Sequence, residues 1–265
     1  MGPVSARVTT CQARTFRRRG QPPPLSDRRR VVPGSRPDTH PLSSMEPDVR
    51  DRSALLTVLT TEHFTLQGAR SGTITESLGR STIYLGSLSA SLVALALVLQ
   101  GGSATDDFRL FALVIFPALV FLGTVTFVRV LETGIEDAIY AQAINRIRHY
   151  YLELAGDDAR YFALGGNDDV RGSLANMGLS PSPWRPFFSI ASVIALINSM
   201  VAGALAGITL DVFAPRAIAL IAGGVLAVVA VTVHFRLGYG RFVRAMESFT
   251  PQFPSAPYAV VPPER

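Results

Sequence analysis

The sequence contains no lysine, so arginine carries all of its fixed positive charge, and it contains a single cysteine, Cys11. One cysteine cannot form an intramolecular disulfide or a cysteine-based metal site, which excludes a disulfide-stapled fold. A chain without lysine is typical of high-G+C bacterial genomes. We take this bias as an indication of the source rather than of any chemistry.

Charge is also missing from four long stretches: residues 82–100, 110–128, 187–210 and 217–235 contain no Asp, Glu, Lys or Arg. Each has about 19 to 24 residues, which is the length that a helix needs to cross a hydrocarbon layer of roughly 30 Å. Helices buried in soluble domains rarely stay uncharged for so long. The sequence therefore predicts an all-α integral membrane protein with four transmembrane helices in two hairpins.

The basic charge lies mainly at the N-terminus. Residues 1–44 hold nine arginines and two aspartates and show no apolar periodicity, so we expect a disordered tail over residues 1–48. The rest of the chain is slightly acidic, and no nucleic-acid partner is expected. No apolar stretch follows these arginines, which excludes a secretory signal peptide. Translation from Met45 instead of Met1 would remove most of the tail.

The first half of the chain predicts a helix that leads into a hairpin. Residues 49–81 show apolar residues at a spacing of three to four, which indicates an amphipathic cytoplasmic helix with a break near Gly79. Its predicted apolar face comprises Leu55, Leu56, Val58, Leu59, Phe64 and Leu66. The first hairpin covers residues 82–130, with a short acidic connector at 101–108. Pro117 lies inside its second helix and is expected to kink it.

The second half follows a similar plan. The second helix is expected to continue out of the membrane to about Leu154 and to stop at Gly156, within a cytoplasmic helical loop over residues 131–186. A short helix over 170–177 would be capped by Asp168 or Asp169. Trp184 precedes the second hairpin, 187–235, at a position suited to the headgroup layer. Residues 236–265 form a Pro-rich cytoplasmic tail, expected to be unstructured from Thr250.

Arginine placement predicts the orientation, because basic residues resist translocation. The two short connectors hold only Arg109 and Arg216, whereas thirteen arginines between Arg50 and Arg244 lie on the other side of the membrane. Both termini and the middle loop are therefore expected in the cytoplasm, and the protein in the inner (plasma) membrane.

Few residues suggest chemistry. Arg146 and Arg148 form a cationic cluster with neighbouring aromatic residues and are candidate contacts for an anion or a lipid headgroup, or else part of a solvated helix face. Asn198 and Ser199 are the most polar residues deep in a span, and they could line a polar path or join helices. Small residues recur every four positions in three spans. This pattern indicates either close packing of helices within one chain or dimerisation. We expect no cofactor and no enzymatic activity, because no phosphate loop, Ser–His–Asp order or Cys/His cluster is present.

The order of parts over residues 55–97 and 138–154 resembles small two-span bacterial effectors of nucleotide-signalled defence, although the second hairpin departs from that pattern. The chain after Met45 also resembles four-span membrane proteins of high-G+C bacteria, a likeness that implies no activity and no functional residues. We therefore expect a non-catalytic membrane scaffold, sensor or effector that forms homo-oligomers in the lipid bilayer. A small uncoupled transporter with a path near Asn198 is the first alternative, and a membrane-bound enzyme the second.

Overall fold

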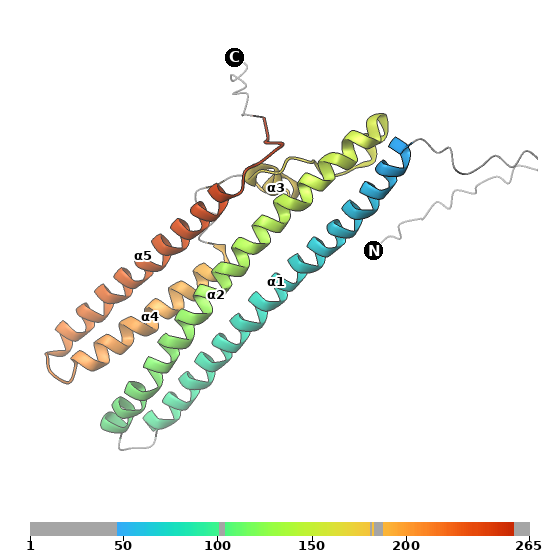
Figure 1. The fold of residues 1–265 in the computed structure, drawn as a ribbon. Helices are drawn as coiled ribbons and strands as arrows, with labels where there is room; N and C mark the ends of the chain where they lie inside the picture. Colours follow the sequence, from blue (N-terminus) through green and yellow to red (C-terminus); the bar gives the residue numbers. More distant parts are fainter. Residues whose placement is uncertain (1–46, 101–103, 181, 183–187, 257–265) are drawn as a thin grey trace, which may run out of the picture. The chain divides into compact units, whose positions relative to one another are not determined.

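The computed structural model describes residues 47–100, 104–180, 182 and 188–256, and its regular structure there is all helical, which confirms the predicted fold class (Figure 1). The elements in chain order are α1 (Pro47–Gln100), α2 (Ala104–Ala155), the 3₁₀ helix η2 (Gly156–Tyr161), α3 (Val170–Asn176), α4 (Ile190–Leu210) and α5 (Arg216–Ser248). The predictions for the N-terminal tail up to Glu46 and for Trp184 lie outside the described residues.

Four of the helices are long and apolar enough to cross a bilayer, which confirms the four predicted spans. α4 has 21 residues and rises about 31 Å, close to the thickness of the hydrocarbon layer. α1 and α2 have 54 and 52 residues and each rise about 80 Å. Beyond the bilayer α1 extends by roughly 50 Å and α2 by roughly 40 Å, and we call this part, residues 47–81 of α1 and 129–155 of α2, the stalk.

The prediction of a break near Gly79 is wrong, because α1 is one continuous helix. A glycine inside a helix costs only about 1 kcal/mol relative to alanine. α1 lies beside α2 (Figure 1), and Thr73, Ser81 and Tyr84 on either side of Gly79 are buried. Packing of this face therefore outweighs the weak local preference for a break.

The buried face of α1 in the stalk also differs from the prediction. Its half-buried members recur every three to four residues, the spacing of a seam between two packed helices: Leu56, Leu59, His63 and Leu66. Three residues predicted on the apolar face are instead exposed: Leu55, Val58 and Phe64. The leucine spacing therefore predicted the line of contact with α2 to within one residue. It did not show which of the neighbouring apolar residues are buried and which are exposed.

α2 continues from the membrane into the stalk and ends at Ala155, as predicted. Gly156 lies directly after it and has a φ of 51°, and glycine adopts this left-handed backbone conformation without strain. Pro117 lies inside the helix on an exposed face, and α2 is helical on both sides of it.

α4 and α5 form the second hairpin and pack through small residues. A Cβ atom at Gly203 would lie 2.5 Å from the Gly223 carbonyl oxygen, and one at Gly223 would lie 2.6 Å from the Gly203 carbonyl oxygen. Such close backbones exclude larger side chains. The small residues of the third and fourth spans therefore serve packing within this chain.

α5 continues past residue 235, where the sequence predicted the end of the fourth span, and reaches Ser248. Gly238 lies beside α2, since a Cβ atom there would be 3.6 Å from the Phe127 ring, and Arg241 pairs with Glu132 at 3.3 Å. These contacts with α2 extend the helix beyond its apolar run.

Ion pairs lie at both ends of the apolar part of α2. Arg109 donates to Asp211 at 2.6 Å, at the end where the short connectors lie, which we call the connector end. Arg129 donates from Nε and Nη2 to the two carboxylate oxygens of Glu76 at 2.8 and 3.0 Å, where the stalk begins. α2 rises about 30 Å between Arg109 and Arg129, so the two ion pairs match the two headgroup layers.

Candidate functional site

The two arginines predicted as anion contacts lie near the end of α2 and have separate surroundings. Arg146 donates from Nε to Asp168 Oδ2 at 2.7 Å and from Nη2 to the Thr250 carbonyl oxygen at 2.7 Å. Its guanidinium carbon lies 4.7 Å from the centroid of the Phe249 ring, a cation–π distance. Arg146 thus connects α2 with the loop before α3 and with the chain after α5.

Asp168 is the centre of this arrangement. Its side chain is fully buried and accepts the backbone N–H groups of Gln252 at 2.9 Å and Phe253 at 2.7 Å, besides the Arg146 guanidinium. Burial alone would raise the pKa of Asp168, but these two N–H bonds and Arg146 outweigh burial and hold the pKa below its ordinary value. Asp168 is therefore a charged carboxylate held by Arg146 of α2 and by the backbone of residues 252 and 253.

Residues 250–256, which we call the strap, contradict the prediction of an unstructured tail from Thr250. The Phe253 carbonyl oxygen accepts the backbone N–H of Asp168 at 3.2 Å, and the Phe253 ring stacks on the His149 ring with centroids 3.6 Å apart. The Ser255 hydroxyl donates to Asp169 Oδ1 at 2.7 Å. Proline fixes φ and so lowers the entropy lost on docking, which makes this Pro-containing segment suited to an extended, bound conformation.

The loop that presents Asp168 depends on glycine. A Cβ atom at Gly166 would lie 2.7 Å from His149 Cα, so only glycine lets the loop approach the α2 backbone this closely. Asp169 then caps α3 by accepting the Gly172 N–H at 2.8 Å, which confirms the predicted cap. The local sequence indicated a turn and a cap here, whereas the strap partner lies more than 80 residues further along the chain.

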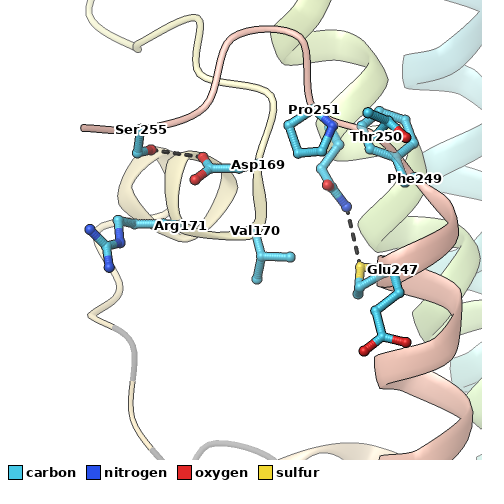
Figure 2. A pocket seen from close by; sticks show the side chains of 10 residues that line it. Asp169, Val170, Arg171, Glu247, Phe249, Thr250, Pro251 and Ser255 are labelled. Carbon is cyan, nitrogen blue, oxygen red and sulfur yellow. Dashed lines mark hydrogen bonds between the residues drawn. The ribbon is translucent and has the colours of Figure 1, made fainter. Parts of the chain in front are cut away.

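An open cavity of about 640 Å³ lies between the strap, the end of α5 and the start of α3 (Figure 2). Its charged side chains are Asp169, Arg171 and Glu247. Arg171 Nη1 donates to the Ala256 carbonyl oxygen at 3.1 Å, so the strap borders the cavity on that side. Among the residues that the structure describes, no three His, Cys, Asp or Glu side chains converge as a metal site would require.

Arg148 lies outside this cluster. Its Nη1 donates to Asn145 Oδ1 at 2.7 Å, and Asn145 Nδ2 donates to the Asn167 carbonyl oxygen at 2.9 Å. Arg148 thus orients an amide that fixes the loop before α3. The structure does not bring Arg146 and Arg148 together around one open site, and their role as headgroup contacts stays a prediction.

The predicted polar residues of the third span lie where the spans meet. Asn198 is 1% exposed, its Nδ2 donates to Thr124 Oγ1 of α2 at 3.1 Å, and the Tyr84 hydroxyl of α1 lies 3.5 Å from its Oδ1. Gly123 of α2 contacts the same amide, because a Cβ atom there would overlap Asn198 Oδ1. Asn198 therefore joins α1, α2 and α4, which favours helix packing over a polar path.

Ser199 extends this cluster to α5. Its Oγ donates to the Ala195 carbonyl oxygen at 2.7 Å and lies 3.2 Å from His234 Nδ1. His234 Nδ1 also lies 2.8 Å from the Ala230 carbonyl oxygen, which requires a proton on that nitrogen. Nδ1 therefore cannot accept the Ser199 proton, and the pair lacks the base that nucleophilic catalysis needs.

Sequence reasoning missed an ion-pair network where the stalk begins, because acidic residues on a helix outside the membrane are ordinary surface residues by sequence alone. Besides Glu76, Arg129 contacts Glu132 and Glu136, each at 3.4 Å, and Arg241 of α5 contacts Glu132. The network joins α1, α2 and α5. The helical spacing along α2 indicates that Glu132 and Glu136 lie on the same face as Arg129, but only the lateral order of the helices brings Glu76 and Arg241 to them.

No protein-family model matches the chain, and comparisons with curated proteins and with solved structures likewise gave no match.

Proposed function

We propose that the protein is a non-catalytic, oligomeric scaffold or sensor of a bacterial plasma membrane, with its termini and stalk in the cytoplasm. The observation that supports this most is the continuity of α1 and α2 from the membrane into the stalk. A continuous helix pair is a rigid element, and rigid elements are what couple one site in a protein to another.

Cross-links between elements support the same proposal. Arg129 with Glu76 and Arg241 with Glu132 tie α1, α2 and α5 together at the base of the stalk. Further out, Asp168 ties the strap, and through it α5, to α2. A partner that displaces the strap would thereby loosen α5 from the stalk, which is the behaviour of a sensor. The effector variant, suggested by the likeness to two-span defence effectors, differs in that the assembled protein would open the membrane.

A scaffold or sensor needs a partner that contacts the stalk, and crosslinking tests this. The photoreactive residue p-benzoylphenylalanine is placed at Val58 or Phe64, which are 64% and 65% exposed on the stalk. The matched control is Leu97, which is 63% exposed but lies within the first span. We expect discrete protein adducts, or crosslinked copies of this chain, from both stalk positions and none from Leu97. Stalk positions that give no discrete adduct would overturn the proposal.

A second measurement separates the proposal from the transporter alternative. The purified chain in liposomes should give no dye or ion flux above empty liposomes, and its detergent-corrected mass should exceed that of one chain. Flux that depends on Asn198 would favour the transporter, and a strictly monomeric protein would contradict the oligomeric part of the proposal. Dye leakage from liposomes that persists in Asn198→Leu would instead favour the effector.

A further inference from the structure

A groove of about 660 Å³ runs along the α4/α5 hairpin at the connector end of the spans. Its volume lies in the range of roughly 300–1,000 Å³ typical of ligand sites. Most of its lining is apolar or small, and Met200, Ala204 and Gly224 are examples. Gly224 borders open space, because a Cβ atom there would have no neighbour within 4 Å.

The depth of the groove matches one leaflet of a bilayer. On α4 and its C-cap the lining extends from Met200 to Asp211, and on α5 from Arg216 to Ala227. Each stretch rises about 16 Å, which is half of a hydrocarbon layer of roughly 30 Å. A transmembrane helix of a second copy would need a groove along both leaflets, whereas a lipid chain needs only one.

The mouth of the groove is charged, unlike its walls. Arg109 and Asp211 pair there at 2.6 Å, and Arg216 is exposed beside them at the start of α5. Arg216 has no ion-pair partner within the part of the chain that the structure describes. An arginine at the headgroup level next to an apolar groove is complementary to a lipid phosphate.

We propose that this groove binds one phospholipid of the leaflet at the connector end, with an acyl chain along α4 and α5 and its phosphate on Arg216. Gly203 and Gly223 are already used for contact between α4 and α5, so they are not free to receive another helix. Gly224 and Ala204 leave the space that the acyl chain fills. The bound lipid covers the seam between the two hairpins, where Arg109 of α2 meets Asp211 of α4–α5.

Two variants with matched controls test the two halves of the site. Gly224→Leu fills the groove, and Gly86→Leu is its control, because Gly86 lies in the first span with no atom within 4 Å of an added Cβ. Arg216→Gln removes the phosphate contact, and Arg236→Gln is its control at the opposite end of the apolar part of α5. The full chain is delipidated in detergent, and binding of dioleoylphosphatidylglycerol is measured by native mass spectrometry.

We expect one tightly held lipid per chain, binding weakened about tenfold or more by Gly224→Leu and about three- to tenfold by Arg216→Gln, with both controls within about twofold of the wild type. Dioleoylglycerol, which has the chains without the phosphate, should bind wild type and Arg216→Gln equally. Glycerol phosphate, which has the phosphate without the chains, should not compete.

Several results would overturn the proposal. Wild-type binding by Gly224→Leu would exclude the groove, and competition by glycerol phosphate would indicate a site for free phosphate. A Gly224→Leu protein that changes from dimer to monomer while keeping its lipid would identify a second copy as the occupant. Gly224→Ala, a smaller change, covers the case in which the leucine variant fails to fold, and it should bind between wild type and Gly224→Leu.

Discussion

Replacing Asp168 by asparagine should release the strap from the loop before α3. The carboxylate accepts two backbone N–H groups, from Gln252 and Phe253, and the Nε of Arg146. An amide keeps the shape, but one of its two ends is a donor that would face these donors, and its charge is lost. The buried site offers no water to compensate, because the side chain of Asp168 is fully buried.

The size of the expected destabilisation in Asp168→Asn follows from the exposure of Asp168 and Arg146. Removing one partner of a fully buried ion pair costs about 3–5 kcal/mol. Arg146 is 37% exposed, so water screens part of the interaction, and we expect a loss of about 2–3 kcal/mol in the free energy that holds the strap. This corresponds to roughly 30- to 150-fold more frequent opening.

Hydrogen–deuterium exchange of the full chain in nanodiscs measures this opening directly. The amides of Gln252 and Phe253 should exchange faster in Asp168→Asn by that factor, while amides in the membrane-spanning parts of α4 and α5 keep their wild-type rates. Asp157→Asn, a change in an exposed carboxylate of η2, is the control and should match the wild type. Unchanged protection of both amides in Asp168→Asn would refute the reasoning.

The same site predicts a pH dependence with a definite sign. The pKa of Asp168 is lower in the folded protein than its ordinary value of about 3.9, so the charged carboxylate stabilises the docked strap fully above that value. This stabilisation is lost as the pH falls below about 4 and through the lowered pKa. Protection of Gln252 and Phe253 that is already lost near pH 6 would contradict the role given to Asp168.

Three further predictions concern the spans. Gly123→Ala should lower the free energy of unfolding by about 1–3 kcal/mol, because its Cβ atom would overlap Asn198. The control, Gly134→Ala on the same helix, has open space around it and should be neutral or stabilising in thermal unfolding. Equal effects of the two variants would contradict the packing around Asn198. Asn198→Leu should lower the free energy of unfolding by about 1–2 kcal/mol, because it loses the hydrogen bond to Thr124 and crowds Gly123. The permeability of liposomes that contain the variant should not change. A stability equal to that of the wild type would show that this hydrogen bond contributes nothing. A phosphatase that is active only outside the cytoplasm should be active when fused after Asp107 and inactive near Gly165; the reverse pattern would invert the proposed topology.

The candidate sites were only partly predictable from the sequence. The sequence identifies Asn198 as a polar residue in an apolar span, which fits either a polar path or helix packing. Only the structure, which places Thr124 and Tyr84 beside it, favours helix packing. Local charge density singles out Arg146 in the sequence. It cannot indicate that the Arg146 guanidinium is already bound by the buried Asp168 and by the strap. Asp168 itself was expected only as an alternative cap for α3.

By itself the sequence determined which segments enter the membrane, that they form two helical hairpins, where α2 ends and how α3 begins. These features depend on the composition of one segment or on the conformational preferences of a few neighbouring residues, and both can be read along the chain. The tertiary structure alone decided that α1 passes unbroken through Gly79, that α5 reaches Ser248 and that the strap docks on Asp168. In each case the deciding free energy comes from contacts with α2 or with a loop far away in the chain, and these contacts exist only once the helices lie side by side.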